Sequence, residues 1–241
     1  MNAIETRALT KRYGDKTVVD RLDMTVREGE LFALLGVNGA GKTTTIRMLS
    51  CLIRPTEGDA MLLGDSILTE SAAVKQKINV SPQETAVAPN LTVRENLELM
   101  AGIYGAADRR RQADDMLERL GLTEVASSRA KILSGGWQRR LSIAMALISE
   151  PKILFLDEPT LGLDVLARRE LWQVIRALKQ RSTVILTTHY LEEAEALADR
   201  VGIMAGGKLR AVGTPTELKA LAGTDSFEDA FITLAAGKEA L

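Results

Sequence analysis

The chain has 241 residues, of which 46% are hydrophobic and 26% are charged, the composition of a folded globular protein rather than a disordered one. Its 31 lysines and arginines nearly balance 32 aspartates and glutamates, so no broad basic face is expected and we predict no nucleic-acid partner. The single cysteine, Cys51, excludes an internal disulfide and a cysteine metal site.

No stretch of the sequence has the apolar length of a membrane-spanning helix or the apolar core of a signal peptide. We therefore expect any contact with a membrane to go through a partner protein. The length suits one compact unit, with or without an inserted subdomain, and the cysteine count fits a reducing cytoplasm.

The first 35 residues have the alternation and turns of short strands, and they lead into an apolar run, Leu31 to Leu35, that predicts a buried parallel strand. The pattern Gly36-x-x-x-x-Gly41-Lys42-Thr43 follows directly, and Thr44 to Ser50 have the composition of a helix start. A strand, a glycine-rich turn and a helix in this order predict a phosphate-binding loop.

Each residue type in this loop has a physical task. Glycines let backbone N–H groups approach a phosphate, the following helix adds its positive end, Lys42 supplies an ammonium for the β and γ oxygens, and Thr43 offers a hydroxyl to Mg²⁺. The expected nucleotide contacts in the loop are Gly36, Val37, Asn38, Gly39, Ala40, Gly41, Lys42, Thr43 and Thr44.

A second strand-rich piece is predicted from Gly58 to Val80, and a helical region from Leu91 to Ile148. Near the end of the helical region, Ser134-Gly135-Gly136 stands at the start of an apolar helix and could form a second anion cradle. One nucleotide rarely needs two cradles, so we hypothesise that this one contacts a γ-phosphate held by another copy. The alternative is a plain serine helix cap.

The apolar run Ile153 to Leu156 predicts a strand that ends in two carboxylates, Asp157 and Glu158. We expect Asp157 to hold Mg²⁺ and Glu158 to polarise an attacking water. Helix, strand, helix and strand patterns then alternate as far as residue 208, and His189, the only histidine, follows the strand at 183–188. A histidine there could hydrogen-bond a γ-phosphate and orient water.

Taken together, the phosphate loop, SPQE, LSGGW, ILFLDEP, TLGLD and TTH resemble the nucleotide-binding subunit of an ABC transporter over about residues 3 to 220. The resemblance implies an α/β fold: a P-loop NTPase (ABC ATPase) core with an N-terminal antiparallel β subdomain and an inserted α-helical subdomain. The ATPase domain would cover residues 1–220, with the helical insert at about 84–150, and residues 221–241 would form a short C-terminal extension.

The resemblance also assigns roles. Gln83 would contact Mg²⁺ and water and report to the membrane partner, Asp164 would meet the opposite subunit, Tyr13 would stack on adenine, Val18 would lie beside the sugar, and His189 would be the switch histidine. The catalytic residues would be Glu158, His189 and Gln83; the Mg²⁺ ligands Thr43, Gln83 and Asp157; and the contacts from the other subunit Ser134, Gly135, Gly136 and Asp164. ATP and Mg²⁺ are the implied cofactors. Trp137 departs from the glutamine or methionine more usual at its position.

The later segments, such as GWQRRLSIAMAL and DVLARRELWQVI, resemble the ATPases of ABC-2 type exporters of drugs, antibiotics and polysaccharides. The implied function is an ATPase that energises export by a separate membrane permease through ATP-driven head-to-tail dimerisation. Its partners would be that permease and a second ATPase subunit, identical or paralogous, at the cytoplasmic face of the membrane.

Three alternatives stay open at this stage. The chain could serve an importer or a lipid-extraction system, although only 23 residues follow Leu218, which leaves little room for the regulatory domain of sugar importers. It could be a non-transport regulatory ABC ATPase, although such translation-linked proteins normally carry two ATPase units. An unrelated P-loop kinase or GTPase would leave LSGGW and His189 unexplained.

Overall fold

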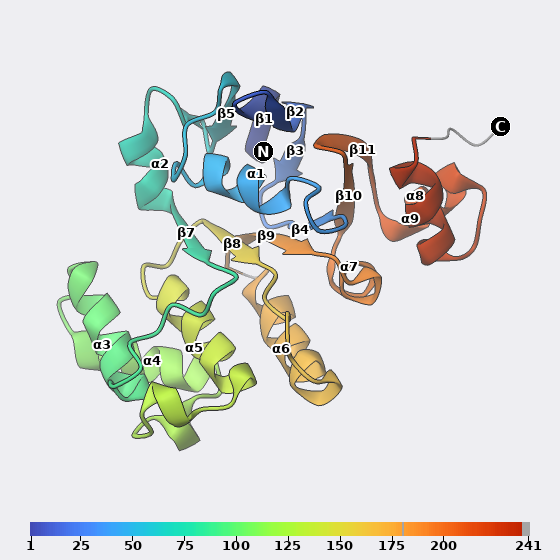
Figure 1. The fold of residues 1–241 in the computed structure, drawn as a ribbon. Coiled ribbons are helices and arrows are strands. Elements are labelled where there is room, and N and C mark those ends of the chain that lie inside the picture. The colour runs from blue at the N-terminus through green and yellow to red at the C-terminus, as the bar shows by residue number, and fades with distance from the viewer. Residues whose placement is uncertain (180, 238–241) are drawn as a thin grey trace.

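The computed structural model describes residues 1–179 and 181–237, which form two β-sheets flanked by helices (Figure 1). The strands are β1 (Asn2–Tyr13), β2 (Lys16–Leu22), β3 (Thr25–Arg27), β4 (Leu31–Leu35), β5 (Glu57–Leu62), β6 (Asp65–Ser66), β7 (Ile78–Ser81), β8 (Ile153–Asp157), β9 (Thr183–Thr188), β10 (Arg200–Ala205) and β11 (Lys208–Gly213). The helices are α1 (Lys42–Leu49), α2 (Ser71–Lys77), α3 (Val93–Ile103), α4 (Arg109–Arg119), α5 (Gly135–Leu147), α6 (Val165–Leu178), α7 (Leu191–Leu197), α8 (Pro215–Ala222) and α9 (Phe227–Ala235). Two short 3₁₀ helices cover Thr123–Val125 and Ala130–Ile132.

The smaller sheet has the strand order β2-β1-β5-β6, with β3 also paired to β1, and every pairing in it is antiparallel. It is built from the first strands of the chain and from the piece that follows α1. This is the expected N-terminal antiparallel β subdomain.

The central sheet has the order β11-β10-β4-β9-β8-β7. Its strands β10, β4, β9, β8 and β7 run parallel, and only β11 at the edge is antiparallel. Parallel strands are normally covered on both faces of the sheet, and accordingly all residues of β4 are buried. Phe32 and Leu34 pack with α1 and the smaller sheet, whereas Ala33 and Leu35 pack with α7, α8 and α9.

The helical region lies to one side of the central sheet, where α3 and α4 pack on α5 (Figure 1). Apolar residues of all three helices share one buried cluster with the faces of β8 and β9 that lie opposite α1, so the insert is anchored on the sheet. Thr92 begins α3 with a capping box, its hydroxyl accepting from Glu95 N–H while the Glu95 carboxylate accepts from Thr92 N–H. Gly121, with φ of 63°, follows the end of α4 as the sequence predicted.

Two segments differ from the sequence-based expectation. The piece from Gly58 to Val80 contains a helix, α2, whose only buried residue is Val74, so its apolar periodicity was too weak to detect. At the other end, β11, α8 and α9 follow β10, and Leu218, Phe227 and Leu234 lie in the same buried cluster as β4. Helix α8 therefore runs across residue 220, where we expected a boundary.

Candidate active site

The site lies where four neighbouring parallel strands end. In the order β4-β9-β8-β7, their carboxyl ends continue into Gly36, His189, Glu158 and the segment that carries Gln83. Register places Leu35 opposite Thr188, and Asp157 opposite Thr187, so these ends are level. Open α/β sheets bind ligands at this edge because loops from adjacent strands meet there.

The phosphate loop is held by close backbone contacts that only glycine permits. Gly41 has a φ of 106°, and a Cβ on it would lie 2.7 Å from Val18 O, while a Cβ on Gly36 would collide with Met204 O. The loop carries Lys42 inward, where its Nζ donates to Gly36 O at 2.7 Å and to Val37 O at 3.3 Å. The ammonium is therefore fixed at the mouth of the loop, as phosphate binding requires.

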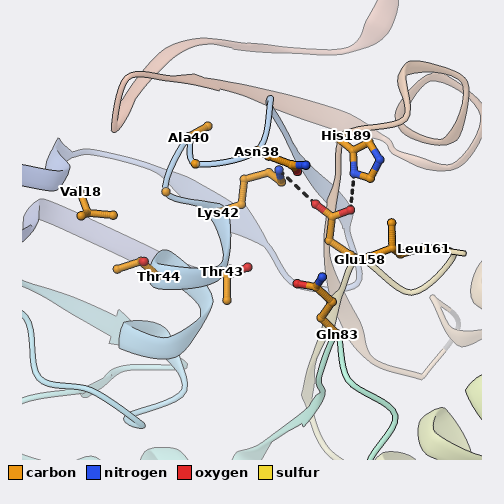
Figure 2. A pocket seen from close by; sticks show the side chains of 12 residues that line it. Val18, Asn38, Ala40, Lys42, Thr43, Thr44, Gln83, Glu158, Leu161 and His189 are labelled. Atoms are coloured by element: carbon orange, nitrogen blue, oxygen red, sulfur yellow. Dashed lines mark hydrogen bonds and ion pairs between the residues drawn. The ribbon is translucent and has the colours of Figure 1, made fainter.

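Glu158 joins this lysine to the histidine of the next strand. Its Oε1 lies 3.1 Å from Lys42 Nζ and its Oε2 lies 2.5 Å from His189 Nδ1, and Figure 2 shows both side chains turned toward the carboxylate. Glu158 is also in the left-handed region, with φ of 50°, which a non-glycine residue adopts only when its surroundings hold it. Its N–H provides that hold by donating to Thr187 O and to Thr187 Oγ1 at 3.0 Å.

The carboxylate of Asp157 faces the Thr43 hydroxyl at the end of the phosphate loop. Its Oδ1 accepts hydrogen bonds from Thr43 Oγ1 at 3.1 Å and from Thr187 Oγ1 at 2.6 Å. A carboxylate and a threonine hydroxyl are hard oxygen donors, the chemistry that suits Mg²⁺ when substrate phosphates supply further ligands. The pair Thr43 and Asp157 fits the expected metal position.

Lys42, Thr43, Glu158 and His189 border a pocket of about 320 Å³, whereas Asp157 is not among its lining residues. Gln83 lies across it from Thr43 and below Glu158 in Figure 2, and Val18 closes another side. The lining residues are Val18, Asn38, Gly39, Ala40, Gly41, Lys42, Thr43, Thr44, Gln83, Glu158, Leu161 and His189. The structure thus brings together most of the residues that the sequence assigned to the nucleotide, and adds Leu161.

Tyr13 is not among these lining residues. It lies at the end of β1, its side chain is 51% exposed, and Lys11 Nζ lies 5.2 Å from its ring centre. A ring held at the surface in this way is accessible for stacking, and its role toward adenine stays a prediction.

Ser134, Gly135 and Gly136 do not line the pocket of their own chain either. Ser134 is the N-cap residue of α5, but its hydroxyl caps no backbone N–H, and both Ser134 and Gly135 are exposed. This disfavours the plain helix cap that we considered as the alternative, because a capping serine would satisfy an amide of its own helix.

The Ser134 tip lies beside the loop that carries Asp164. A Cβ on Gly136 would lie 3.2 Å from Ala167 Cβ, and one on Gly135 would lie 3.6 Å from Leu163 Cδ2. Asp164 Oδ1 accepts from Ala167 N–H and caps α6. The residues expected to reach the other subunit therefore share one surface. Trp137 packs inward on the helical cluster, with the Arg140 guanidinium 5.0 Å from its ring centre.

Sequence reasoning missed three polar residues around the site. The Thr187 hydroxyl donates to the Asp157 carboxylate and accepts from the Glu158 N–H. Arg139 donates to the carbonyls of Pro82 and Gln83, and Glu193 is fully buried in α7. The carboxyl of Glu193 accepts from Trp172 Nε1 at 3.0 Å, and burial raises its pKa above the ordinary 4.5 although Thr188, Thr160 and Trp172 act to lower it. The motif TTH pointed to Thr187, but the other two gave no signal without the fold.

Comparisons with known proteins identify the family. The sequence profile of the ABC transporter family matches residues 19–161. The chain belongs to this family. It is 44% identical to the daunorubicin resistance ATP-binding protein DrrA3 of Streptomyces coeruleorubidus, over 94% of this chain and 72% of that protein. It is 41% identical to the linearmycin resistance ATP-binding protein LnrL of Bacillus subtilis, over 92% of this chain and 73% of that protein.

Among solved structures, a dimeric ATP-binding cassette in a post-hydrolysis state, bound to ADP and Pi, superposes with a TM-score of 0.78 at 27% identity. The match covers 88% of this chain and 98% of that one. These findings confirm the α/β P-loop ABC ATPase fold and the resemblance to ABC-2 type subunits. The chain is thus the ATP-binding, ATP-hydrolysing subunit of an ABC transporter. No helix in the two described stretches is long and apolar enough to cross a bilayer.

Proposed function

We propose that this subunit energises export by a separate membrane permease, and that two subunits close head to tail on ATP and Mg²⁺ at the cytoplasmic face of the membrane. The observation that carries the proposal is the arrangement of Glu158 between Lys42 and His189, at the sheet edge where the phosphate loop opens. The names of the relatives, which include two resistance proteins, support export over import.

The geometry suggests how hydrolysis proceeds. Triphosphate oxygens compete with Glu158 for Lys42, because both are anions that bind the same ammonium. Once Lys42 turns to the phosphates, Glu158 Oε1 is available to accept a proton from water as the water oxygen attacks the γ-phosphorus. His189 stays on Oε2, so it fixes the orientation of the carboxylate beside the transferred phosphoryl group.

The metal would be held by Thr43 and Asp157, whose oxygens already lie 3.1 Å apart, with Gln83 on the opposite wall. When bound, Mg²⁺ neutralises charge on the β and γ oxygens. Thr187 holds the Asp157 carboxylate at this position by donating its hydroxyl to Oδ1 at 2.6 Å.

The second subunit completes the enclosure. The Ser134 hydroxyl, which caps no amide of its own helix, and the first amides of α5 would form an anion cradle, and the loop that carries Asp164 lies beside it. We assign this surface to the γ-phosphate bound by the other subunit. Closure then follows from differential affinity, because ATP presents a γ-phosphate to Ser134 and ADP does not.

The permease would contact the helical insert on α3. Three apolar side chains, Leu99, Ile103 and Tyr104, are about half or more exposed there, and a cleft of about 420 Å³ lies beside Tyr104. An apolar surface next to a cleft fits the apolar face of a docking helix.

The test is crosslinking in the complete transporter, purified with the membrane protein that accompanies this subunit in the cell. Ile103→Cys should crosslink to the permease, and Ile232→Cys, at an isoleucine of α9 that is also more than half exposed, should not. ATPase activity of the same complex should rise when exported compounds are added. Crosslinks from position 232 alone, or activity that no permease alters, would overturn the proposal.

A further inference from the structure

One guanidinium in this chain is buried without a carboxylate. Arg139 lies in α5 with 5% of its surface exposed, and it forms no salt bridge within the described residues. Its Nη1 donates to Pro82 O at 2.7 Å and its Nη2 donates to Gln83 O at 2.5 Å. One planar side chain therefore holds two successive carbonyls at the residue that faces the nucleotide pocket.

A second contact joins the same two segments. Ser142 lies three residues after Arg139 and so on the same face of α5, and its hydroxyl is 3.1 Å from the hydroxyl of Ser81. Both serines are buried. Helix α5 is thus attached to the end of β7 at two points, across residues 81 to 83.

The other end of α5 is the Ser134 tip. Arg139 lies five positions after Ser134, a distance of about 7.5 Å along a helix. Because a helix moves as a rigid element over one and a half turns, a shift of the backbone at Gln83 reaches Ser134 through this attachment. Gln83 lines the pocket of its own chain, whereas Ser134 does not.

Arginine is a costly choice if the position only has to fill space. Burial disfavours the charged form and lowers the pKa of Arg139, although the charge of Asp157 acts in the opposite direction. An apolar side chain of similar volume would avoid this desolvation. What arginine supplies is a rigid fork of donors that fixes two acceptors at once, which lysine cannot reproduce.

We propose that Arg139 is a positioning residue that couples the two nucleotide sites of the dimer, by tying Gln83 in the site of its own chain to Ser134 in the site of the partner. The proposal rests on the head-to-tail dimer described under the proposed function. It assigns to Arg139 no contact with nucleotide, and it predicts that the residue affects closure more than binding.

The experiment measures closure and binding separately. In full-length protein carrying Glu158→Gln, the dimer dissociation constant is measured by sedimentation at saturating ATP and Mg²⁺, and ATP binding is measured on dilute monomer. Arg139→Met should weaken the dimer between about 2- and 30-fold and leave monomer affinity within about twofold. Arg139→Lys should lie between Arg139→Met and the parent protein.

Two controls keep the test decisive. Arg94→Met removes a surface arginine of the same subdomain, paired with Asp114, and should change neither quantity. Ser142→Ala removes the second contact with little change in volume, so it tests the attachment even if Arg139→Met fails to fold.

An unchanged dimer constant in folded Arg139→Met, Arg139→Lys and Ser142→Ala proteins would overturn the coupling. So would equal losses in monomer binding and in dimerisation, because these would place the effect in the chain's own site. If the parent Glu158→Gln protein forms no ATP-dependent dimer, the proposed function fails instead, and the two failures are distinguishable.

Discussion

Two helices of this chain begin at a glycine-rich tip: α1 at the phosphate loop and α5 at Ser134. Both tips offer backbone amides to an anion, but the groups around them differ. At the phosphate loop, Lys42 and Glu158 are each 5% exposed and pair with one another, and Lys42 also donates to Gly36 O. At the other tip, Ser134 is exposed, its hydroxyl caps nothing, and the neighbouring Gly135 is exposed as well. The groups around the first tip are in place within one chain, whereas we propose that a second chain's nucleotide completes the other.

The difference follows from where each tip lies in the fold. The phosphate loop follows a fully buried strand in the middle of the sheet, so neighbouring strands supply Glu158, Thr187 and His189 around it. The Ser134 tip begins a helix of the insert, and its two glycines lie beside the loop that carries Asp164. Removing groups from the first tip should therefore stop chemistry, whereas removing groups from the second should stop assembly.

The largest effect is expected at Glu158. Glu158→Gln keeps the size of the side chain but removes the base, so steady-state phosphate release should fall about 10²- to 10⁴-fold. ATP binding should persist, and ATP-dependent dimers should accumulate in gel filtration because turnover no longer separates them. Glu195→Gln, at an exposed glutamate on α7, is the matched control and should behave as wild type. Hydrolysis at an unchanged rate would remove Glu158 from the mechanism.

A smaller effect, of a different kind, is expected at Ser134. Ser134→Ala removes one hydrogen bond to a charged phosphate and should weaken the ATP-dependent dimer about 10- to 100-fold. Nucleotide binding to the monomer should not change, since Ser134 is not part of the pocket of its own chain. Ser127→Ala, at an exposed serine of the same segment, supplies the control. Loss of monomer binding in Ser134→Ala would contradict the division between the two tips.

Substitution of Tyr13 tests the adenine contact predicted next to the phosphate loop. Because its ring is exposed, Tyr13→Ala should leave folding intact, and loss of one stacking contact should raise the dissociation constant for ATP about 2- to 12-fold. Tyr13→Phe should restore binding, because the ring and not the hydroxyl makes the contact. Equal affinity in Tyr13→Ala and wild type, measured by fluorescence titration, would show that adenine lies elsewhere.

The smallest effect is expected on the free energy of unfolding, through the buried carboxyl group of Glu193 in α7. Burial raises the pKa of Glu193 above 4.5, so the neutral form is the one that stabilises the fold, and stability is lost as pH rises through the folded-state pKa. Glu193→Gln stays neutral and still accepts from Trp172, so its unfolding free energy should fall less between pH 5 and pH 8 than that of wild type. Each unit of pKa shift corresponds to about 1.4 kcal/mol. In urea titrations Glu192→Gln, at an exposed neighbour, should follow wild type; parallel curves for Glu193→Gln would contradict the assignment.

The sequence predicted the first tip well because its signals are local. A buried strand, glycines and Lys42 lie within a dozen residues, and the acids Asp157 and Glu158 end their own apolar strand. His189 and Ser134 also drew attention by their places after a strand and before a helix, and the resemblance to a known family then supplied Gln83. What these residues have in common is a position next to a strand or helix end, where pattern and chemistry coincide.

The sequence could not predict contacts that depend on strand order. Arg139 and Gln83 are 56 residues apart, and they meet only because β7 pairs with β8 at the edge of the sheet beneath α5. In the sequence LEEAEALADR nothing distinguishes Glu193 from the other acidic residues. Its complete burial follows from the packing of α7 between α6 and β4. The sequence did not predict helix α2, because Val74 is its only buried residue and one residue gives no apolar periodicity.

The dependence of activity on protein concentration tests the central claim most directly. If triphosphate is hydrolysed only between two chains, specific ATPase activity must rise with subunit concentration and reach a plateau once dimers dominate. We predict this rise, and we predict that Ser134→Ala shifts it to higher concentration. A specific activity that is constant from dilute monomer to concentrated protein would contradict the account.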